Sequence, residues 1–388
     1  MTEYPTAKLG EFCKTGSGGT PSRNQMERYY EGGTIPWVKS GELREGLIAT
    51  TDEYVTEIAI KESSVKLVPA GAILLAMYGA TVGRLAILGV EATTNQAVCH
   101  IVPDPNIADT RYLYHAISAQ VPTIVAMGVG GAQPNISQGL IKDLRISLPP
   151  LPEQRRIAAI LDQADALRAK RREALADLES LTQSIFIEMF GDPVRNPKGW
   201  PLSKLGNVGS LNRGVSKHRP RNAPELLGGE YPLVQTGEVA NCDGYIRSHN
   251  SSYSELGLRQ SKIWPAGTLC ITIAANIAKT GILTFDACFP DSVVGFRADS
   301  QEIAEYVRVW LSFLQQSLEA AAPESAQKNI NLAILRGLDI PLPPMPLKRK
   351  FALQVHAVEK LKTSQREALA ELDALFASLQ HRAFRGEL

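Results

Sequence analysis

The side chains that most often perform catalysis or bind metals are scattered along this chain of 388 residues. The cysteines are odd in number, widely spaced and without a CxxC pair: Cys13, Cys99, Cys242, Cys270 and Cys288. This spacing supports neither a zinc site nor a disulfide framework. The six histidines are also dispersed, and the GxxxxGK sequence of a phosphate-binding loop is absent. We therefore expect no metal, no cofactor and no catalytic group, and we expect free thiols that are mostly buried.

Hydrogen-bonding side chains are concentrated instead in short segments marked by glycine and proline. Residues 16–22 have the sequence GSGGTPS, and residues 77–84 have the sequence MYGATVGR. Segments 196 positions later, NRGVSKH at 212–218 and IAANIAKT at 273–280, occupy corresponding places but have different contents. Small residues beside polar ones let another molecule approach the backbone closely. A constant frame with variable loops is typical of proteins whose scaffold is fixed and whose recognition surface differs.

The frame that positions these loops is duplicated. Residues 133–190 return as residues 327–384, at an offset of 194 and without a gap. Within them, the sequence REALA at 172–176 returns unchanged at 366–370. Chance does not produce so long a correspondence. The chain therefore contains two copies of a module, each followed by a long helix.

A proline-rich elbow precedes each predicted helix, with the sequence LPPLP at 148–152 and LPPMP at 342–346. Consecutive prolines lack backbone donors and favour extended geometry in the residue before them, so each elbow should be stiff. The breakers GDP at 191–193 and NPKG at 196–199 should end the first helix near Phe190.

Both predicted helices have a seven-residue pattern that indicates an a/d seam and an antiparallel coiled coil between them. The alternative is a long helix that packs on its own domain. Arg171 and Gln365 are polar at equivalent a positions, where such residues fix register and partner. The a positions are Ile157, Ala164, Arg171, Leu178 and Ile185, then Phe351, Val358, Gln365, Leu372 and Leu379. The d positions are Ile160, Leu167, Ala174 and Leu181, then Gln354, Leu361, Ala368 and Leu375.

The modules themselves should be of mixed α/β type. Short β-rich runs at 71–77 and 85–88 lie between turns, and residues 111–125 have helical spacing. We predict an α+β fold with two such modules, two long antiparallel helices and an internal pseudo-two-fold repeat. The expected boundaries are 1–150 for the first module, 151–190 for the first helix, 191–345 for the second module and 346–388 for the second helix.

Composition limits the class of protein. Hydrophobic residues make up 44% of the chain, and no apolar run approaches the roughly 20 residues of a membrane span. The N-terminal sequence lacks the pattern of a signal peptide, so we expect a cytoplasmic protein. The net charge of +1 argues against a simple electrostatic nucleic-acid binder. Any such binding must come from local patches or be shared with a more basic partner.

Four motifs together resemble the specificity subunit of type I restriction–modification systems, over essentially the whole length. They are LPPLPEQ at 148–154, IPWVKSGE at 35–42, GATVGR at 79–84 and TNQAV at 94–98. The second elbow departs from the pattern because its sequence from Pro346 to Arg349, PLKR, lacks the Glu153–Gln154 pair of the first. That departure indicates that a partner contact there differs.

The resemblance implies that the modules are two target-recognition domains, each recognising one half of an asymmetric, bipartite double-stranded DNA sequence. It implies docking of two methyltransferase subunits, which carry S-adenosylmethionine, and association with restriction subunits. The chain itself should be non-catalytic, since its Pro-Pro pairs precede Leu151 and Met345 rather than the aromatic residue of an amino-methyltransferase loop. The alternatives are a stand-alone scaffold without sequence-specific DNA binding and a self-contained methyltransferase, which would bind S-adenosylmethionine.

Under this resemblance the polar loop residues are candidates to contact DNA, because Arg suits guanine and Asn or Gln suits adenine. Solvated turn residues are the alternative. Asn135 and Asn329 are identical in both copies, so we assign them to structure or to phosphate rather than to base recognition. The first-module candidates are Thr20, Ser22, Arg23, Lys39, Ser40, Tyr78, Thr81 and Arg84. The second-module candidates are Arg213, Ser216, Lys217, Arg219, Gln235, Thr236, Asn276, Lys279 and Thr280.

Overall fold

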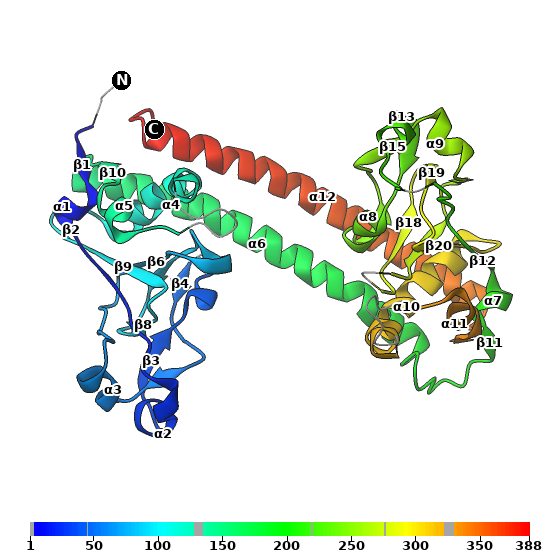
Figure 1. Cartoon of the computed structure of the whole chain (residues 1–388), viewed down its shortest axis with the longest axis horizontal. Helices are drawn as coiled ribbons and strands as arrows, with labels where there is room; N and C mark the ends of the chain where they lie inside the picture. The colour runs from blue at the N-terminus through cyan, green and yellow to red at the C-terminus, as the bar shows by residue number, and fades with distance from the viewer. Residues whose placement is uncertain (1–3, 45, 128–134, 219, 275–276, 322–329) are drawn as a thin grey trace. The chain divides into compact units, whose positions relative to one another are not determined.

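The computed structural model describes residues 4–44, 46–127, 135–218, 220–274, 277–321 and 330–388. Arg219, Asn276 and Asn329 therefore lie outside the described residues, as do the first positions of each copy of the repeat. The chain divides into two units (Figure 1), of which unit 1 is Met1–Arg172 with Glu367–Leu388 and unit 2 is Glu173–Arg366. Each unit contains one module and one part of each long helix.

Unit 1 contains a five-stranded sheet in the order β2-β9-β6-β7-β4. Its central strand β6 (Ile73–Ala76) is fully buried because both faces are covered. Ile73 and Leu75 pack with helix residues on one side, and Leu74 and Ala76 pack into a second apolar cluster on the other. The remaining strands are β1 (Thr6–Lys8), β2 (Cys13–Ser17), β3 (Ile35–Val38), β4 (Leu47–Ile48), β5 (Tyr54–Val55), β7 (Leu85–Leu88), β8 (Thr93–Thr94), β9 (Val98–Pro103) and β10 (Arg145–Ser147).

Helix α4 (Thr110–Ala126) covers one face of this sheet and confirms the helix predicted over 111–125. Asp109 caps it by accepting hydrogen bonds from the backbone N–H groups of Arg111 and Tyr112. Leu113 and Ile117 face the sheet and are fully buried. The short helices are α1 (Leu9–Phe12), α2 (Met26–Tyr29), α3 (Glu57–Glu62) and α5 (Gln138–Lys142), with 3₁₀ turns η1 (Arg23–Gln25), η2 (Ser40–Glu42) and η3 (Gly79–Thr81).

Unit 2 repeats this architecture, with a five-stranded sheet in the order β12-β20-β17-β18-β14. Its strands are β11 (Leu202–Lys204), β12 (Ser210–Arg213), β13 (Leu227–Leu233), β14 (Gly244–Ile246), β15 (Ser251–Tyr253), β16 (Ile263–Trp264), β17 (Leu269–Thr272), β18 (Thr280–Leu283), β19 (Ala287–Cys288), β20 (Val293–Arg297) and β21 (Asp339–Pro341). Its helices are α7 (Leu205–Val208), α8 (Thr236–Ala240), α9 (Glu255–Arg259), α10 (Gln301–Ala321) and α11 (Leu332–Gly337), with the 3₁₀ turn η4 (Pro224–Leu226). The sequence repeat is therefore a repeat of sheet order.

Each elbow is anchored by the same pair of contacts. In unit 1 the Leu148 N–H donates to the Pro5 carbonyl at 2.8 Å, and the buried Tyr112 hydroxyl donates to the Ser147 carbonyl at 2.7 Å. Both recur in unit 2, from Leu342 to Pro201 at 2.8 Å and from Tyr306 to Pro341 at 2.8 Å. Prolines supply no competing donors here, so the chain enters each long helix in a fixed direction.

The long helices are α6 (Leu151–Phe190) and α12 (Met345–Ala383), and α6 ends at the predicted residue. Inside unit 1 their parts run antiparallel. Arg156 near the start of α6 donates to the carbonyl of Leu388 at 2.7 Å, and Arg168 pairs with Asp373 at 2.6 Å. Inside unit 2, Phe186 and Phe190 pack on Phe351 at the start of α12.

The predicted d positions are wrong for both helices. Leu167 is 47% exposed, Leu361 53% and Leu375 50%. The buried stripe lies one residue further along, four residues after each a position, and contains Leu161, Thr182, Val355, Lys362, Phe376 and Ala383. The reason is that each part of a long helix packs on the module of its unit as well as on the other helix. Leu161 and Phe376 do so in the core of unit 1. A stripe of this spacing faces both neighbours.

Candidate nucleic-acid interface

Two of the candidate cations in unit 1 meet at one carboxylate. Glu53 accepts from Lys39 Nζ at 2.6 Å and from Arg23 Nη2 at 2.6 Å. The hydrogen bond from Lys39, followed by that from Arg23, holds the pKa of Glu53 below its usual value, and Glu53 in turn raises the pKa of Lys39. No sequence motif marks Glu53, since it lies 14 positions beyond Lys39 and its role depends on the fold.

Aromatic rings fix the direction of the Arg23 side chain. Its guanidinium lies 4.5 Å from the ring centre of Tyr30 and 5.2 Å from that of Trp37. The side chain nevertheless stays 46% exposed. A guanidinium that is stacked and tethered to a carboxylate loses little further freedom when it binds, so Arg23 is suited to oriented hydrogen bonds with a base edge or phosphate.

The glutamate of the SGE and TGE sequences is structural in both units. Glu42 accepts from the Lys39 backbone N–H at 3.2 Å. Glu238 accepts from the backbone N–H of Gln235 at 3.2 Å and from Asn250 Nδ2 at 3.1 Å. These bonds hold the turn that carries the candidates Ser40 in unit 1 and Gln235 and Thr236 in unit 2, all of which are at least partly exposed.

The remaining unit 1 candidates lie on two loops. Thr20 is exposed and hydrogen-bonds Gln96, a residue of the TNQAV motif, and Ser22 is exposed at the start of η1. Tyr78 and Thr81 are half-buried, and burial raises the pKa of Tyr78. Arg84 is exposed three residues after the end of η3, and Asn135 is also exposed.

In unit 2 one candidate residue is buried. Ser216 is only 6% exposed, so its side chain is not available to DNA in this conformation. Arg213 and Lys217 are exposed on either side of it. The Lys217 backbone N–H donates to Gln260 Oε1 at 2.6 Å, which fixes the loop and leaves the ammonium in solvent.

The correspondence between the loops at 77–84 and 273–280 is shifted by one residue from the sequence prediction. In unit 1 the Ala76 N–H donates to the Arg84 carbonyl, and in unit 2 the Thr272 N–H donates to the Lys279 carbonyl, both at 2.9 Å. Arg84 is therefore equivalent to Lys279 and not to Thr280. Gly83 and Ala278 precede them, with φ of 83° and 58° respectively. Both loops therefore place a residue with a left-handed backbone directly before the cation. In unit 2 this residue is Ala278 and not a glycine, so the sequence does not mark the position.

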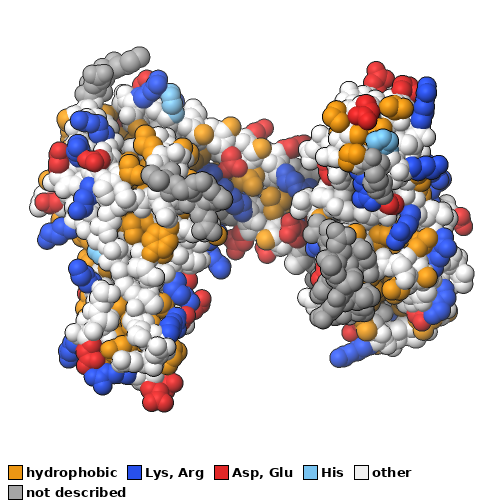
Figure 2. Space-filling model, in the orientation of Figure 1, with side chains coloured by type: hydrophobic (Ala, Val, Ile, Leu, Met, Phe, Trp, Pro, Cys, Tyr) orange, Lys and Arg blue, Asp and Glu red, His pale blue; other side chains and the backbone are white. Residues whose placement is uncertain are grey.

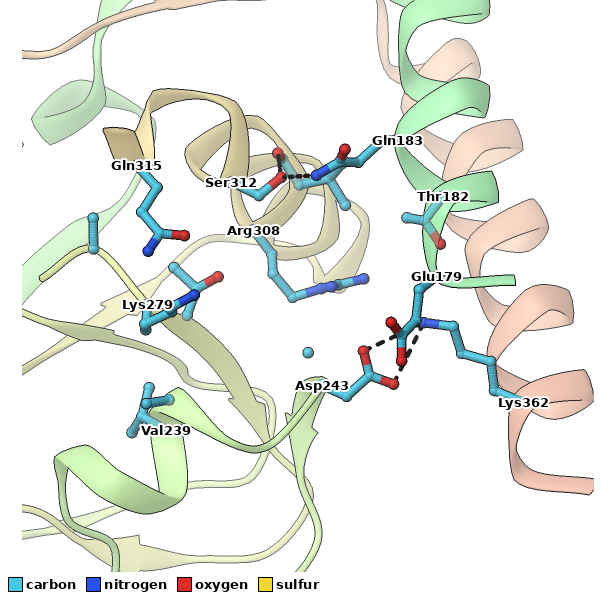
Figure 3. Close-up of a pocket in the computed structure, with 15 residues that line it drawn as sticks. Glu179, Thr182, Gln183, Val239, Asp243, Lys279, Arg308, Ser312, Gln315 and Lys362 are labelled. Atoms are coloured by element: carbon cyan, nitrogen blue, oxygen red, sulfur yellow. Dashed lines mark hydrogen bonds and ion pairs between the residues drawn. The ribbon is translucent and has the colours of Figure 1, made fainter. Parts of the chain in front are cut away.

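Lys279 and Thr280 line a groove of about 240 Å³ in unit 2 (Figure 3). Its walls come from α6, α8, the start of β18, α10 and α12. Arg308 extends from α10 toward Glu179, while Lys279 lies on the other side. Asp243 on the turn after α8 contacts Lys362 of α12 at 3.4 Å.

An equivalent groove of about 610 Å³ lies in unit 1. Arg84 occupies the place of Lys279, and Tyr114 on α4 occupies the place of Arg308. A second cation comes from Arg44, beside η2. Away from these grooves, Figure 2 shows basic and acidic side chains interspersed over the visible face of each unit, in agreement with the net charge of +1.

The described residues contain no group of three or more His, Cys, Asp or Glu side chains that could hold a metal ion. All five cysteines are free, and four of them are buried. Burial raises the pKa of the Cys13 and Cys99 thiols to about 12, so neither is a reactive thiolate near neutral pH. Among the same residues, no helix is both long enough and apolar enough to cross a membrane.

Comparison with known proteins agrees with this architecture. The family described as type I restriction modification DNA specificity domain matches residues 1–177 and again residues 197–373. The chain belongs to this family. It is a specificity subunit of the type I restriction–modification class, whose role is recognition of a DNA target, and subunits of this class are non-catalytic.

Individual relatives match at different lengths. The chain is similar to the EcoR124I/EcoR124II specificity subunit of Escherichia coli, with 34% identity over 43% of this chain and 42% of that one. It is also similar to the MjaIX specificity subunit of Methanocaldococcus jannaschii, with 23% identity over 95% of this chain and 89% of that one. A crystal structure of a type I S subunit from M. genitalium has the same fold, with a TM-score of 0.59 at 15% identity, covering 98% of this chain and 96% of that one.

Proposed function

We propose that the chain recognises an asymmetric, bipartite double-stranded DNA target, with residues 1–150 and 191–345 acting as two target-recognition domains. The observation that carries this proposal is the recurrence of one sheet order in both units with different side chains on the same loops. Arg23 and Lys39 of unit 1 correspond to no like-charged pair in unit 2, where Gln235 takes the place of Lys39. Different donors on one scaffold suit two different half-sites.

The proposed DNA contacts come from three surfaces in each unit. Small and polar residues surround the charged ones, which lets the backbone of a duplex approach. In unit 1 the surfaces are formed by Thr20, Ser22 and Arg23, by Lys39 and Ser40, and by Tyr78, Thr81 and Arg84. In unit 2 they are formed by Arg213 and Lys217, by Gln235 and Thr236, and by Lys279 and Thr280.

We further propose that the long helices, residues 151–190 and 346–388, pair as a coiled coil that positions two methyltransferase subunits, with restriction subunits joining them. Leucines that the fold leaves in solvent support the docking of partner subunits on these helices. In unit 1 they are Leu167 and Leu375. In unit 2 Leu361 is joined by Leu353, which is 73% exposed. Apolar side chains at helical spacing on an exposed face suit a partner helix.

Exchange of residues 1–150 for the first module of another family member tests the bipartite proposal. Methylation mapping at N6 of adenine, with and without the chain, should show that one half-site changes and the other stays. Exchange of residues 191–345 is the matched control and should change the opposite half. If either exchange alters both halves, the two modules do not recognise DNA independently.

A matched insertion tests whether the helices set the distance between half-sites. Four residues placed within 166–176 and four within 360–370 lengthen each helix by about 6 Å. The mapped spacer should lengthen while both half-sites keep their sequences. An unchanged spacer would contradict this role.

A further inference from the structure

The groove of unit 2 contains polar groups that the described fold leaves unsatisfied. Within the part of the chain that the structure describes, Arg308 Nη2 and Thr182 Oγ1 are buried and have no hydrogen-bond partner. Both residues line the groove, and Thr182 is 7% exposed. Buried polar atoms are normally paired, so two such atoms in one groove indicate an occupant that accepts hydrogen bonds.

The surroundings fix the position of Arg308. Its Nε donates to Glu305 at 3.0 Å, and the guanidinium lies 5.1 Å from the ring centre of Tyr245. Nη2 of the same guanidinium keeps no hydrogen-bond partner among the described residues, and Arg308 lines the groove. The Lys279 ammonium forms no ion pair with any described residue. A guanidinium that Glu305 holds in place and an ammonium without an ion pair to any described residue therefore line the same groove.

The charge of the groove is suited to a single anion. Asp243 does not compete for one, because it is already neutralised by Lys362 and Arg366. The charged side chains in and next to the groove are Arg247, Lys279, Arg308, Lys362 and Arg366 against Glu179, Asp243, Glu305 and Glu359, an excess of one positive charge among the described residues.

Cations that recur in both units indicate the kind of anion. Arg84 and Lys279 are equivalent by their backbone hydrogen bonds, and each is a cation in an otherwise different loop. A second cation also recurs, as Arg44 from the turn in unit 1 and as Arg308 from the helix in unit 2. Features shared by two domains with different half-sites suit the part of DNA that carries no sequence, which is the backbone.

We propose that these two equivalent grooves each bind one phosphodiester group of the DNA backbone. In unit 2 the phosphate oxygens accept hydrogen bonds from Arg308 Nη2, the Thr182 hydroxyl and the Lys279 ammonium. In unit 1 Arg84 and Arg44 take these roles. The inference rests on the proposed DNA recognition and assigns Arg84 and Lys279 to phosphate rather than to bases.

The salt dependence of binding tests the inference. The full chain, assembled with its methyltransferase subunits, is titrated with a duplex containing its mapped target at several salt concentrations. The slope of log affinity against log salt is negative. Arg84→Gln and Lys279→Gln should each make it less steep by about 0.9, and the double variant by about 1.8. The methylated sequence should stay the same. Lys204→Gln is the control, because Lys204 pairs with Asp339 at 2.8 Å outside the groove.

Thr182→Val tests the groove without changing any charge. The substitution keeps the shape of the side chain and removes an unpaired hydroxyl, so the fold should be retained. Binding should weaken about tenfold, as expected for a lost hydrogen bond to a charged group, with no change in salt slope.

Four outcomes would overturn the inference. Unchanged slopes and affinities, with sequence-specific binding intact, would show that the grooves hold no phosphate although DNA recognition stands. A changed target sequence in Arg84→Gln or Lys279→Gln would assign these residues to bases. Weaker assembly with the methyltransferase subunits at unchanged DNA affinity would assign the groove to a protein carboxylate. If the unsubstituted assembly shows no sequence-specific binding, the proposed function itself fails.

Discussion

Phe376 and Thr182 occupy equivalent positions, 194 residues apart, but have different surroundings in the two units. In unit 1 the Phe376 ring packs 4.3 Å from the Arg168 guanidinium and 6.1 Å from the His115 ring. In unit 2 the smaller Thr182 lines the groove that also contains Arg308. The residue at this position of the long helix is therefore part of the core in unit 1 and part of the groove wall in unit 2.

Substitution of these two residues should give the largest contrast in stability. Phe376→Ala removes a buried aromatic ring and two ring contacts, so we expect the free energy of unfolding to fall by about 3–5 kcal/mol. Thr182→Val should change it by less than about 0.5 kcal/mol. Thermal and chemical unfolding of the full chain measure both. Similar losses in the two variants would show that the Thr182 hydroxyl has a stabilising partner and is not unpaired.

The elbows give a second contrast. Gln154 is 1% exposed, and its side chain accepts from the Asp109 N–H at 2.8 Å and donates to the carbonyls of Ile107 and Pro149. The interpretation of the Glu153–Gln154 pair as a partner contact is therefore wrong for Gln154, which joins the start of α6 to its own module. Gln154→Lys should cost about 2–3 kcal/mol, since it buries a charge and leaves the Asp109 donor unpaired.

Lys348 holds the position of Gln154 in unit 2, is 5% exposed, and lies 5.6 Å from the Tyr306 ring centre. Burial lowers the pKa of Lys348, so the unfolded chain binds more protons and stability should rise with pH up to the ordinary lysine pKa of about 10.4. Lys348→Gln should remove this dependence and stabilise unit 2 by about 1 kcal/mol. Unfolding curves at a series of pH values up to about 10.4 check both points. A steeper dependence in the variant would contradict the burial argument.

The smallest change in stability is expected from substitution of Glu53, which is partly exposed. Its lowered pKa contributes stability that is fully present above the ordinary glutamate pKa of about 4.3, and this contribution is lost as pH falls from there through the lower folded-state pKa. Glu53→Gln should cost less than about 1 kcal/mol at pH 7 but should release Arg23 and Lys39. Methylation mapping should then show relaxed preference in the half-site of unit 1 alone. Relaxation in the other half would place Arg23 outside the recognition of this half-site.

Local and periodic features were predictable from sequence. The prolines of each elbow, the helical spacing of 111–125 and the breakers after Phe190 act within a few residues, and the structure confirms each of them. The β-rich run at 71–77 was also recognisable, because a strand buried on both faces needs a continuous apolar sequence.

The buried stripe of the long helices was harder to predict from the sequence. Spacings of three and four residues both lie on one helical face, and the choice between them depends on what packs against that face. Here the module adds a second neighbour, which buries Leu161 and leaves Leu167 exposed. The pairing of Arg23 and Lys39 on Glu53 was equally hidden, since it joins segments that only the fold brings together.

The sequence by itself determined the duplication, the elbows, the long helices, the family and the loops on which recognition depends, because these are covalent or short-range properties. Only the tertiary structure decided that Gln154 is internal, that Ser216 is buried and that Arg84 corresponds to Lys279. It also decided that Thr182 lines a groove, whereas Phe376 at the equivalent position packs in the core. Each of these depends on which distant side chains share a space, and the volume and hydrogen-bond partners of that space exist only in the folded chain.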